Sequence, residues 1–136
     1  RSISMFSKQG MEHVNRALEM INIVGLEERV DELAGNLSYG DQKLLSVARL
    51  LATDTSLLML DEPGAGLSGE MVNRLGDILN KLVDRKKTIL FVDHNMNLVM
   101  NFAENIIVLH HGKVIATGTP EEIQNNPEVI NVYLSG

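Results

Sequence analysis

The sequence predicts an α/β fold in which parallel strands are joined by a crossover helix. Two apolar runs, 57–60 and 88–92, are too short for helices and read as buried strands. Between them, residues 70–85 repeat their apolar side chains with the period of an amphipathic helix. Strand, helix and strand in this order indicate a right-handed βαβ unit, whose two strands end at the same edge of the sheet.

The composition is typical of one modest globular core. The chain has 136 residues, of which 44% are hydrophobic and 22% charged. Its net charge of −6 argues against a general nucleic-acid-binding surface, and the lack of cysteine excludes disulfides and thiolate metal sites. No apolar run approaches the roughly 20 residues that cross a bilayer. Because the chain begins with Arg1 rather than Met, we expect a piece of a longer protein.

The N-terminal third is predicted to be helical. A first helix is expected from Glu12 to a natural stop at Gly25. Its inward-facing stripe is expected to consist of Val14, Ala17, Leu18 and Ile21. A short second helix is expected within 26–33, with Val30 and Leu33 facing inward.

A turn at Leu37–Gln42 precedes a strong helix that is predicted to run through Ala52. Ser38 and Asp41 have the spacing of a capping box, which favours a well-capped helix. A glycine-bearing turn at a helix start also offers N–H groups to an anion, but by itself the cap is the favoured interpretation. The inward-facing side chains of this helix are expected to be Leu44, Val47, Ala48 and Leu51.

Two adjacent carboxylates, Asp61 and Glu62, follow the apolar run 57–60, and Pro63 ends the strand because it lacks an N–H. The strand is expected to be buried on both faces. Acids at the carboxyl end of such a strand suit Mg²⁺, which prefers oxygen ligands, and an attacking water, which needs an acceptor. A strand that ends in a plain polar turn is equally open from this stretch alone.

The helix at 70–85 leads to the second strand. Its inward-facing residues are expected to be Val72, Leu75, Ile78, Leu79 and Leu82. The strand at 88–92 is followed by Asp93 and His94. Since parallel neighbours end at the same edge, Asp61, Glu62 and His94 could converge. A lone histidine is usually structural, but a histidine at the end of a parallel strand beside one that ends in Asp-Glu favours a functional role.

The rest of the chain predicts smaller elements: a helix at 96–103, strands at 105–110 and 113–117, a capped helix from Thr119, and a short helix from Pro127 that docks through Val129, Val132 and Tyr133. The tight turn between the two strands is expected at His111 and Gly112. His110 and His111 are expected in solvent at that turn. A two-histidine metal site is not expected there, because no third ligand lies nearby in the sequence.

The order of these pieces resembles the ATP-binding subunit of ABC transporters. Leu37–Gln42 looks like the signature motif of that family, whose common form is LSGGQ, and is called the signature turn below. Leu57–Glu62 looks like the Walker B strand with its glutamate. Gly66–Ser68 falls at the D-loop, and His94 falls at the switch histidine.

Within the family, the sequence is most similar to the ATPases of branched-chain amino acid importers. The resemblance rests on Leu37–Gly40, Asp61–Leu67, Asp93–Met96 and the tail from Gly118 to Leu134. ATPases that serve urea or lipid transport share parts of these stretches and remain alternatives. A soluble ABC ATPase of DNA repair or translation is ranked lower, and a non-enzymatic fragment with a binding role is the other alternative.

The resemblance implies that ATP and Mg²⁺ are the cofactors. Asp61 would hold the metal, through water. Glu62 would orient or deprotonate the attacking water, and His94 would contact the γ-phosphate; these two are the implied catalytic residues.

The resemblance also implies a nucleotide-binding role for the signature turn. Ser38 and Gly40 would cap the γ-phosphate of a nucleotide held by the opposite subunit, with Tyr39 and Asp41 in the same turn. Ser68 would sit at the seam between the two subunits.

Three departures from the family pattern stand out. Asp41 occupies a position where the signature usually has Gln, so we expect its carboxylate to point away from the nucleotide. Ser68 replaces the usual aspartate of the D-loop. The motif G-x-x-x-x-G-K-[ST], which cradles the phosphates, does not occur in the sequence.

The expected fold class is therefore the C-terminal part of a P-loop NTPase domain of the ABC type. Residues 1–53 would form the helical signature subdomain, and 54–136 the C-terminal part of the ATPase core. The implied partners are a second ATPase subunit and a membrane permease, with no nucleic acid, at the cytoplasmic face of the membrane. Without the phosphate-binding loop, the chain alone is predicted to lack ATPase activity.

The family fold places one more strand between 88–92 and 105–109. If that strand is missing, two sheet edges with apolar faces lack partners, and such edges invite pairing with other chains. The isolated chain is therefore expected to be unstable, to dimerise, or to repack around the gap.

Overall fold

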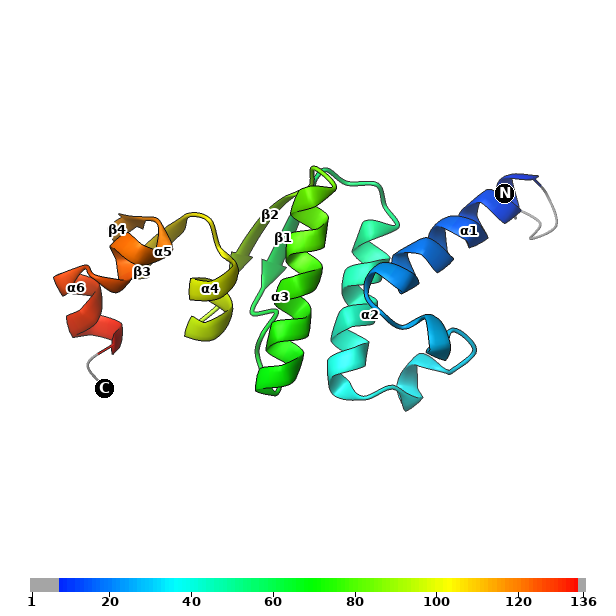
Figure 1. Ribbon diagram of the computed structural model, residues 1–136, viewed down its shortest axis with the longest axis horizontal. Coiled ribbons are helices and arrows are strands. Elements are labelled where there is room, and N and C mark those ends of the chain that lie inside the picture. Colours follow the sequence, from blue (N-terminus) through cyan, green and yellow to red (C-terminus); the bar gives the residue numbers. More distant parts are fainter. Residues whose placement is uncertain (1–7, 135–136) are drawn as a thin grey trace. The chain divides into compact units, whose positions relative to one another are not determined.

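A computed structural model describes residues 8–134. The chain forms two compact units, Arg1–Val92 and Asp93–Gly136, and each is described by itself (Figure 1). The predicted division after residue 53 follows function rather than compactness, and it stays a prediction. Among the described residues, 8–134, no helix combines the length and apolar character needed to cross a membrane.

The N-terminal unit begins with α1 (Lys8–Ile23), which starts before the predicted Glu12. This helix packs against α2 (Tyr39–Leu51), but its predicted inward stripe is largely exposed. The buried apolar side chains are instead Val24 and Leu26, which follow the helix. The prediction was wrong because an apolar period says nothing about whether a partner covers that face.

The segment between α1 and α2 contains two single 3₁₀ turns, Glu27–Arg29 and Ala34–Asn36, instead of the predicted short helix. Val30 and Leu33 do not face inward, and Leu33 is 75% exposed. One turn is too short to present a continuous apolar face to a neighbour.

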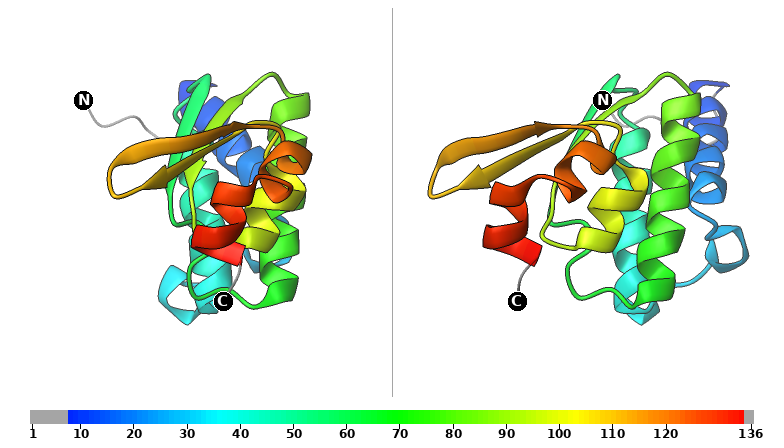
Figure 2. Two further views of the ribbon diagram at one scale, coloured as in Figure 1. Left: turned by 90° about the vertical axis from the view of Figure 1, so that its left-hand side faces the viewer. Right: turned by 60° about the vertical axis from the view of Figure 1, so that its left-hand side comes forward.

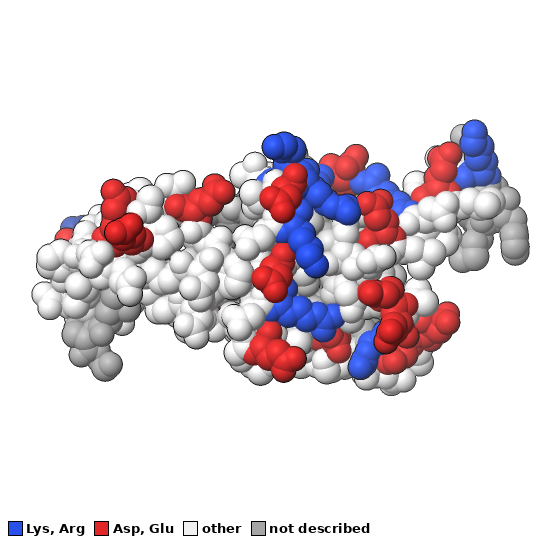
Figure 3. Space-filling model, viewed as in Figure 1, with Lys and Arg blue, Asp and Glu red and all other residues white. Residues whose placement is uncertain are grey.

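The predicted βαβ unit is confirmed. β1 (Leu57–Asp61) and β2 (Thr88–Val92) pair in parallel, with a register that runs from Leu57↔Thr88 to Asp61↔Val92. α3 (Gly69–Asp84) connects them and contacts β2. Acidic and basic side chains alternate along the outer face of α3 (Figure 3).

The core of this unit lies between its helices and one face of the sheet. All predicted inward residues of α2 and α3 are buried, and so is Leu58 of β1. The opposite face of the sheet is open, with Met59 68% and Val92 61% exposed. Burial on both faces was therefore a wrong prediction, because no described element of this unit covers that side.

The C-terminal unit contains α4 (Met96–Phe102), β3 (Ile106–His110), β4 (Lys113–Gly118), α5 (Pro120–Gln124) and α6 (Pro127–Val129) with a helical turn at Ile130–Leu134. β3 and β4 form the predicted antiparallel hairpin, seen in two views in Figure 2. His111 and Gly112 both have positive φ, which is typical of a tight two-residue hairpin turn. Ile106, Ile123 and Val129 form its core.

The ends of the last helices agree with the predicted caps. The side chain of Thr119 accepts a hydrogen bond from the Glu122 amide, and Glu122 accepts one from the Thr119 amide, which completes a capping box. Val129 is buried as predicted, whereas Val132 and Tyr133 are exposed. The Tyr133 hydroxyl still docks, because it donates to the carbonyl oxygen of Leu109.

Candidate functional site

The carboxyl end of β1 carries the two predicted acids. Asp61 is the last strand residue, and the backbone of Glu62 continues the ladder, since its N–H donates to the Val92 carbonyl at 2.7 Å. Glu62 then turns into the left-handed region with φ 44°. That conformation costs a non-glycine residue about 1–2 kcal/mol, so contacts around the loop must hold it. Both carboxylates are exposed.

Lys43 on α2 supplies such contacts. Its ammonium group donates to the carbonyl oxygens of Glu62 at 3.0 Å, Pro63 at 3.2 Å and Ala65 at 2.7 Å. The sequence contains no sign of this role, because the acceptors are backbone atoms of a distant loop. Lys43 is therefore a residue of the site that sequence reasoning missed.

A second contact joins the start of α2 to the same loop. Gly66 has φ +73°, and a Cβ atom there would lie 3.1 Å from Cε1 of Tyr39. The Lys43 ammonium lies 5.5 Å from the centroid of the Tyr39 ring. Glycine at position 66 therefore accommodates Tyr39, a contact that the sequence did not reveal.

Ser38 caps α2 as predicted. Its Oγ accepts a hydrogen bond from the Asp41 N–H at 3.1 Å and donates to Oδ2 of Asp41 at 2.8 Å. The Asp41 carboxylate thus bonds the serine hydroxyl, which differs from the backbone bond of a standard capping box. Ser38 as a residue is exposed to solvent.

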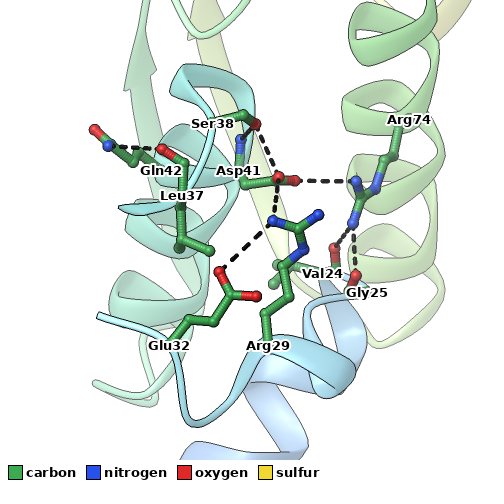
Figure 4. A network of polar contacts seen from close by, with 9 residues as sticks. All are labelled: Val24, Gly25, Arg29, Glu32, Leu37, Ser38, Asp41, Gln42 and Arg74. Atoms are coloured by element: carbon green, nitrogen blue, oxygen red, sulfur yellow. Dashed lines mark hydrogen bonds and ion pairs between the residues drawn. The ribbon is translucent and has the colours of Figure 1, made fainter. Parts of the chain in front are cut away.

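The Asp41 carboxylate faces two arginines from other parts of the unit (Figure 4). Arg74 of α3 donates to Oδ1 at 3.2 Å, and Nη1 of Arg29 lies 3.9 Å from Oδ2. Arg74 also donates to the carbonyl oxygens of Val24 at 3.1 Å and Gly25 at 2.6 Å. Asp41 is only 8% exposed. Its charge is thus balanced within the chain by partners that sequence reasoning missed.

Two further predicted positions have structural contacts of their own. A Cβ atom at Gly40 would lie 2.7 Å from Cε of Met71, so glycine lets α2 approach α3 closely. Ser68 is the N-cap of α3, where its Oγ accepts a hydrogen bond from the Met71 amide at 3.3 Å. The nucleotide and dimer contacts predicted for Gly40 and Ser68 stay predictions.

His94 belongs to the C-terminal unit, and its approach to Asp61 and Glu62 stays a prediction. Its side chain is 77% exposed. Nδ1 lies 4.0 Å from Oδ1 of the neighbouring Asp93, whose side chain is fully buried. The same Oδ1 accepts a hydrogen bond from the Asn95 amide at 2.8 Å, and this bond fixes the backbone directly after His94.

The donor set at the end of β1 is compatible with Mg²⁺. No group of three or more histidine or acidic side chains gathers within residues 8–134 to form a complete metal cage. Mg²⁺ commonly keeps several waters and takes one or two carboxylates together with substrate phosphates. Asp61 and Glu62, both exposed, can supply the one or two carboxylate ligands that such a magnesium site needs.

Comparison with known proteins gives a consistent family assignment. Residues 2–65 match the ABC transporter family, and residues 113–134 match the branched-chain amino acid ATP-binding cassette transporter family. The high-affinity branched-chain amino acid transport ATP-binding protein LivG of Salmonella typhimurium is 42% identical over 95% of this chain and 51% of its own length. BraF of Pseudomonas aeruginosa, of the same description, is 40% identical over 93% of this chain and 49% of its own length.

Solved structures agree at the level of the fold. An ATP-binding cassette of an ABC transporter in its ADP conformation superimposes with a TM-score of 0.83 at 26% identity, over 92% of this chain and 51% of that one. CbiO1 of Clostridium perfringens, part of the ABC transporter complex cbiONQ, gives 0.81 at 28% identity, over 93% of this chain and 51% of that one. The chain spans about half the length of the curated relatives it matches.

Proposed function

The chain belongs to the ATP-binding proteins of ABC transporters, and we propose that it forms the C-terminal part of the energy-coupling ATPase subunit of a branched-chain amino acid importer. The observation that carries the proposal is the end of β1. A parallel βαβ unit presents Asp61 and Glu62 at its carboxyl edge, and α2 holds the loop that follows them. The names of the relatives and the match at residues 113–134 support the transported substrate.

We propose different roles for Asp61 and Glu62 at this edge of the sheet. Asp61 would hold Mg²⁺, which when bound neutralises charge on the phosphates. The Glu62 carboxylate would accept a hydrogen bond, or a proton, from the attacking water. Their exposure supports these roles, because neither carboxylate is enclosed by the protein.

The signature turn would act on a nucleotide held by a second ATPase subunit. Ser38 is an exposed residue at the N-cap of a 13-residue helix, where the helix dipole favours a phosphate. Tyr39 and Gly40 are the first residues of that helix. Asp41 would not contact the nucleotide and would orient the Ser38 hydroxyl, which donates a hydrogen bond to its carboxylate. Ser68, at the start of α3, would lie at the seam between subunits.

His94 would contact the γ-phosphate. In the complete transporter, the permease would convert closure of the two ATPase subunits into transport at the cytoplasmic face of the membrane. The high exposure of the imidazole and the fixed backbone around Asp93 support a contact with a ligand.

The experiment is uptake into vesicles that contain the complete subunit and its permease. We expect ATP-dependent uptake of leucine, isoleucine and valine, lost when Glu62 is replaced by Gln. Uptake of urea or lipid transport in place of branched-chain amino acids would contradict the substrate. An upstream reading frame without a strand followed by G-x-x-x-x-G-K-[ST] would contradict the ATPase itself.

A further inference from the structure

We propose that Lys43 is a positioning residue: it ties the Glu62 loop to the helix that carries the signature turn. The tie itself rests on contacts within the N-terminal unit. Its consequence for ATP hydrolysis rests on the proposed function.

The ammonium group of Lys43 is fully used by the loop. It has three N–H donors, and three carbonyl oxygens accept from it, those of Glu62, Pro63 and Ala65 at 2.7–3.2 Å. A lysine that served a phosphate would need at least one of these donors. Its chemistry here is therefore to hold backbone and not to bind a ligand.

The three carbonyls belong to a loop that contains two residues with positive φ, Glu62 and Gly66. Glu62 has φ 44°, and its carbonyl oxygen also accepts the Ala65 N–H at 3.1 Å. Gly66 closes the loop with φ +73°, directly against the ring of Tyr39. A charged donor at the centre of this loop favours the conformation that fixes where the Glu62 side chain starts.

α2 makes the tie rigid. Lys43 lies one helical turn after Tyr39, and Ser38 is the N-cap of the same helix. Arg74 fixes its first turn through Asp41, and Leu44 beside Lys43 is fully buried. A displacement of the signature turn must therefore move the Lys43 ammonium and the carbonyls that it holds. In the proposed function, this links the turn that contacts one nucleotide to the carboxylate that acts on another.

The first test is amide hydrogen exchange in the complete subunit. Lys43→Met keeps the length of the side chain and removes all three donors. We expect exchange of the Ala65 and Leu67 amides, which close the loop onto Glu62 and Gly64, to rise about tenfold or more. Arg49→Met is the matched control, an exposed cation on the same helix. Equal exchange in the two variants, or an equal rise across the α3 core amides, would overturn the tie.

The second test is ATP hydrolysis by the complete subunit. We expect Lys43→Met to lower kcat about tenfold with little change in the KM for ATP, because Lys43 does not touch the nucleotide. In a Glu62→Gln background the same change should have no further effect, since Lys43 acts through Glu62. A further loss in that background would overturn the positioning role. A wild-type subunit without ATPase activity would instead refute the proposed function, and the exchange experiment would still decide the tie.

Discussion

At the scale of single residues, Asp41 shows how a carboxylate can occupy a turn predicted to face phosphate. Its charge is balanced by Arg74 and Arg29, and its second oxygen accepts the Ser38 hydroxyl. The carboxylate therefore faces cations inside the unit. Asp41, at the position where the family signature usually has glutamine, thus connects the signature turn to Arg74 and Arg29.

A double-mutant cycle measures this pair. Asp41→Asn and Arg74→Met should each lower the free energy of unfolding by about 1–3 kcal/mol, at the lower end because the Arg74 side chain is 36% exposed. The double variant should lose less than the sum, because either change alone already breaks the pair. Urea denaturation gives these values, and Lys81→Met, an exposed cation also on α3, is the control. Additive losses would show that the two residues do not act together.

At the scale of elements, the sequence predicted those features that depend on the spacing of apolar residues and on the residue types found in turns. β1, β2, the buried faces of α2 and α3, and the β3–β4 hairpin all follow from apolar repeats and from residues such as Gly112. The predicted burial of α1 and of both sheet faces failed, because burial depends on a covering partner that a local pattern does not contain.

The same reasoning explains which parts of the site were missed. Asp61 and Glu62 could be predicted because they follow a recognisable strand. Lys43 and Arg74 could not, because their acceptors lie 19 to 50 residues away in sequence and most are carbonyl oxygens, which every residue has. Long-range bonds of side chain to backbone leave no pattern in a single sequence.

Two variants of Ser68, the N-cap of α3, distinguish a structural role of this residue from a role at the interface between subunits. Ser68→Ala should cost about 1 kcal/mol of stability, because it removes the acceptor for the Met71 amide. Ser68→Asp should keep the stability, since aspartate caps equally well. Thermal unfolding measures both. An alanine variant as stable as the wild type would show that the cap contributes nothing. If only the stability changes, and ATP-dependent association of the complete subunit does not, the seam role is contradicted.

At the scale of the whole molecule, residues 8–134 contain two two-stranded sheets, β1–β2 in the N-terminal unit and β3–β4 in the C-terminal unit. On the open face of β1–β2, Leu57, Met59, Leu90 and Val92 are exposed. An apolar sheet face of this kind favours association with another surface.

The isolated chain is therefore expected to self-associate in solution. Light scattering after size-exclusion chromatography should give a mean mass above the 15.0 kDa of one chain, rising with concentration. Met59→Lys should lower this mass, because it places a charge on the exposed sheet face. Val83→Lys, which places the same charge at an exposed apolar residue of α3, should not. A monodisperse monomer for the wild-type chain would refute the expectation.

The most direct test of the central assignment is ATP hydrolysis by the complete subunit, with Glu62 or Gln at residue 62. The assignment predicts that Glu62→Gln abolishes nearly all turnover, by about a hundredfold or more as for loss of a general base, while ATP binding persists. The 136-residue chain alone should show no turnover. Undiminished hydrolysis by the Glu62→Gln subunit, or robust hydrolysis by the chain alone, would contradict it.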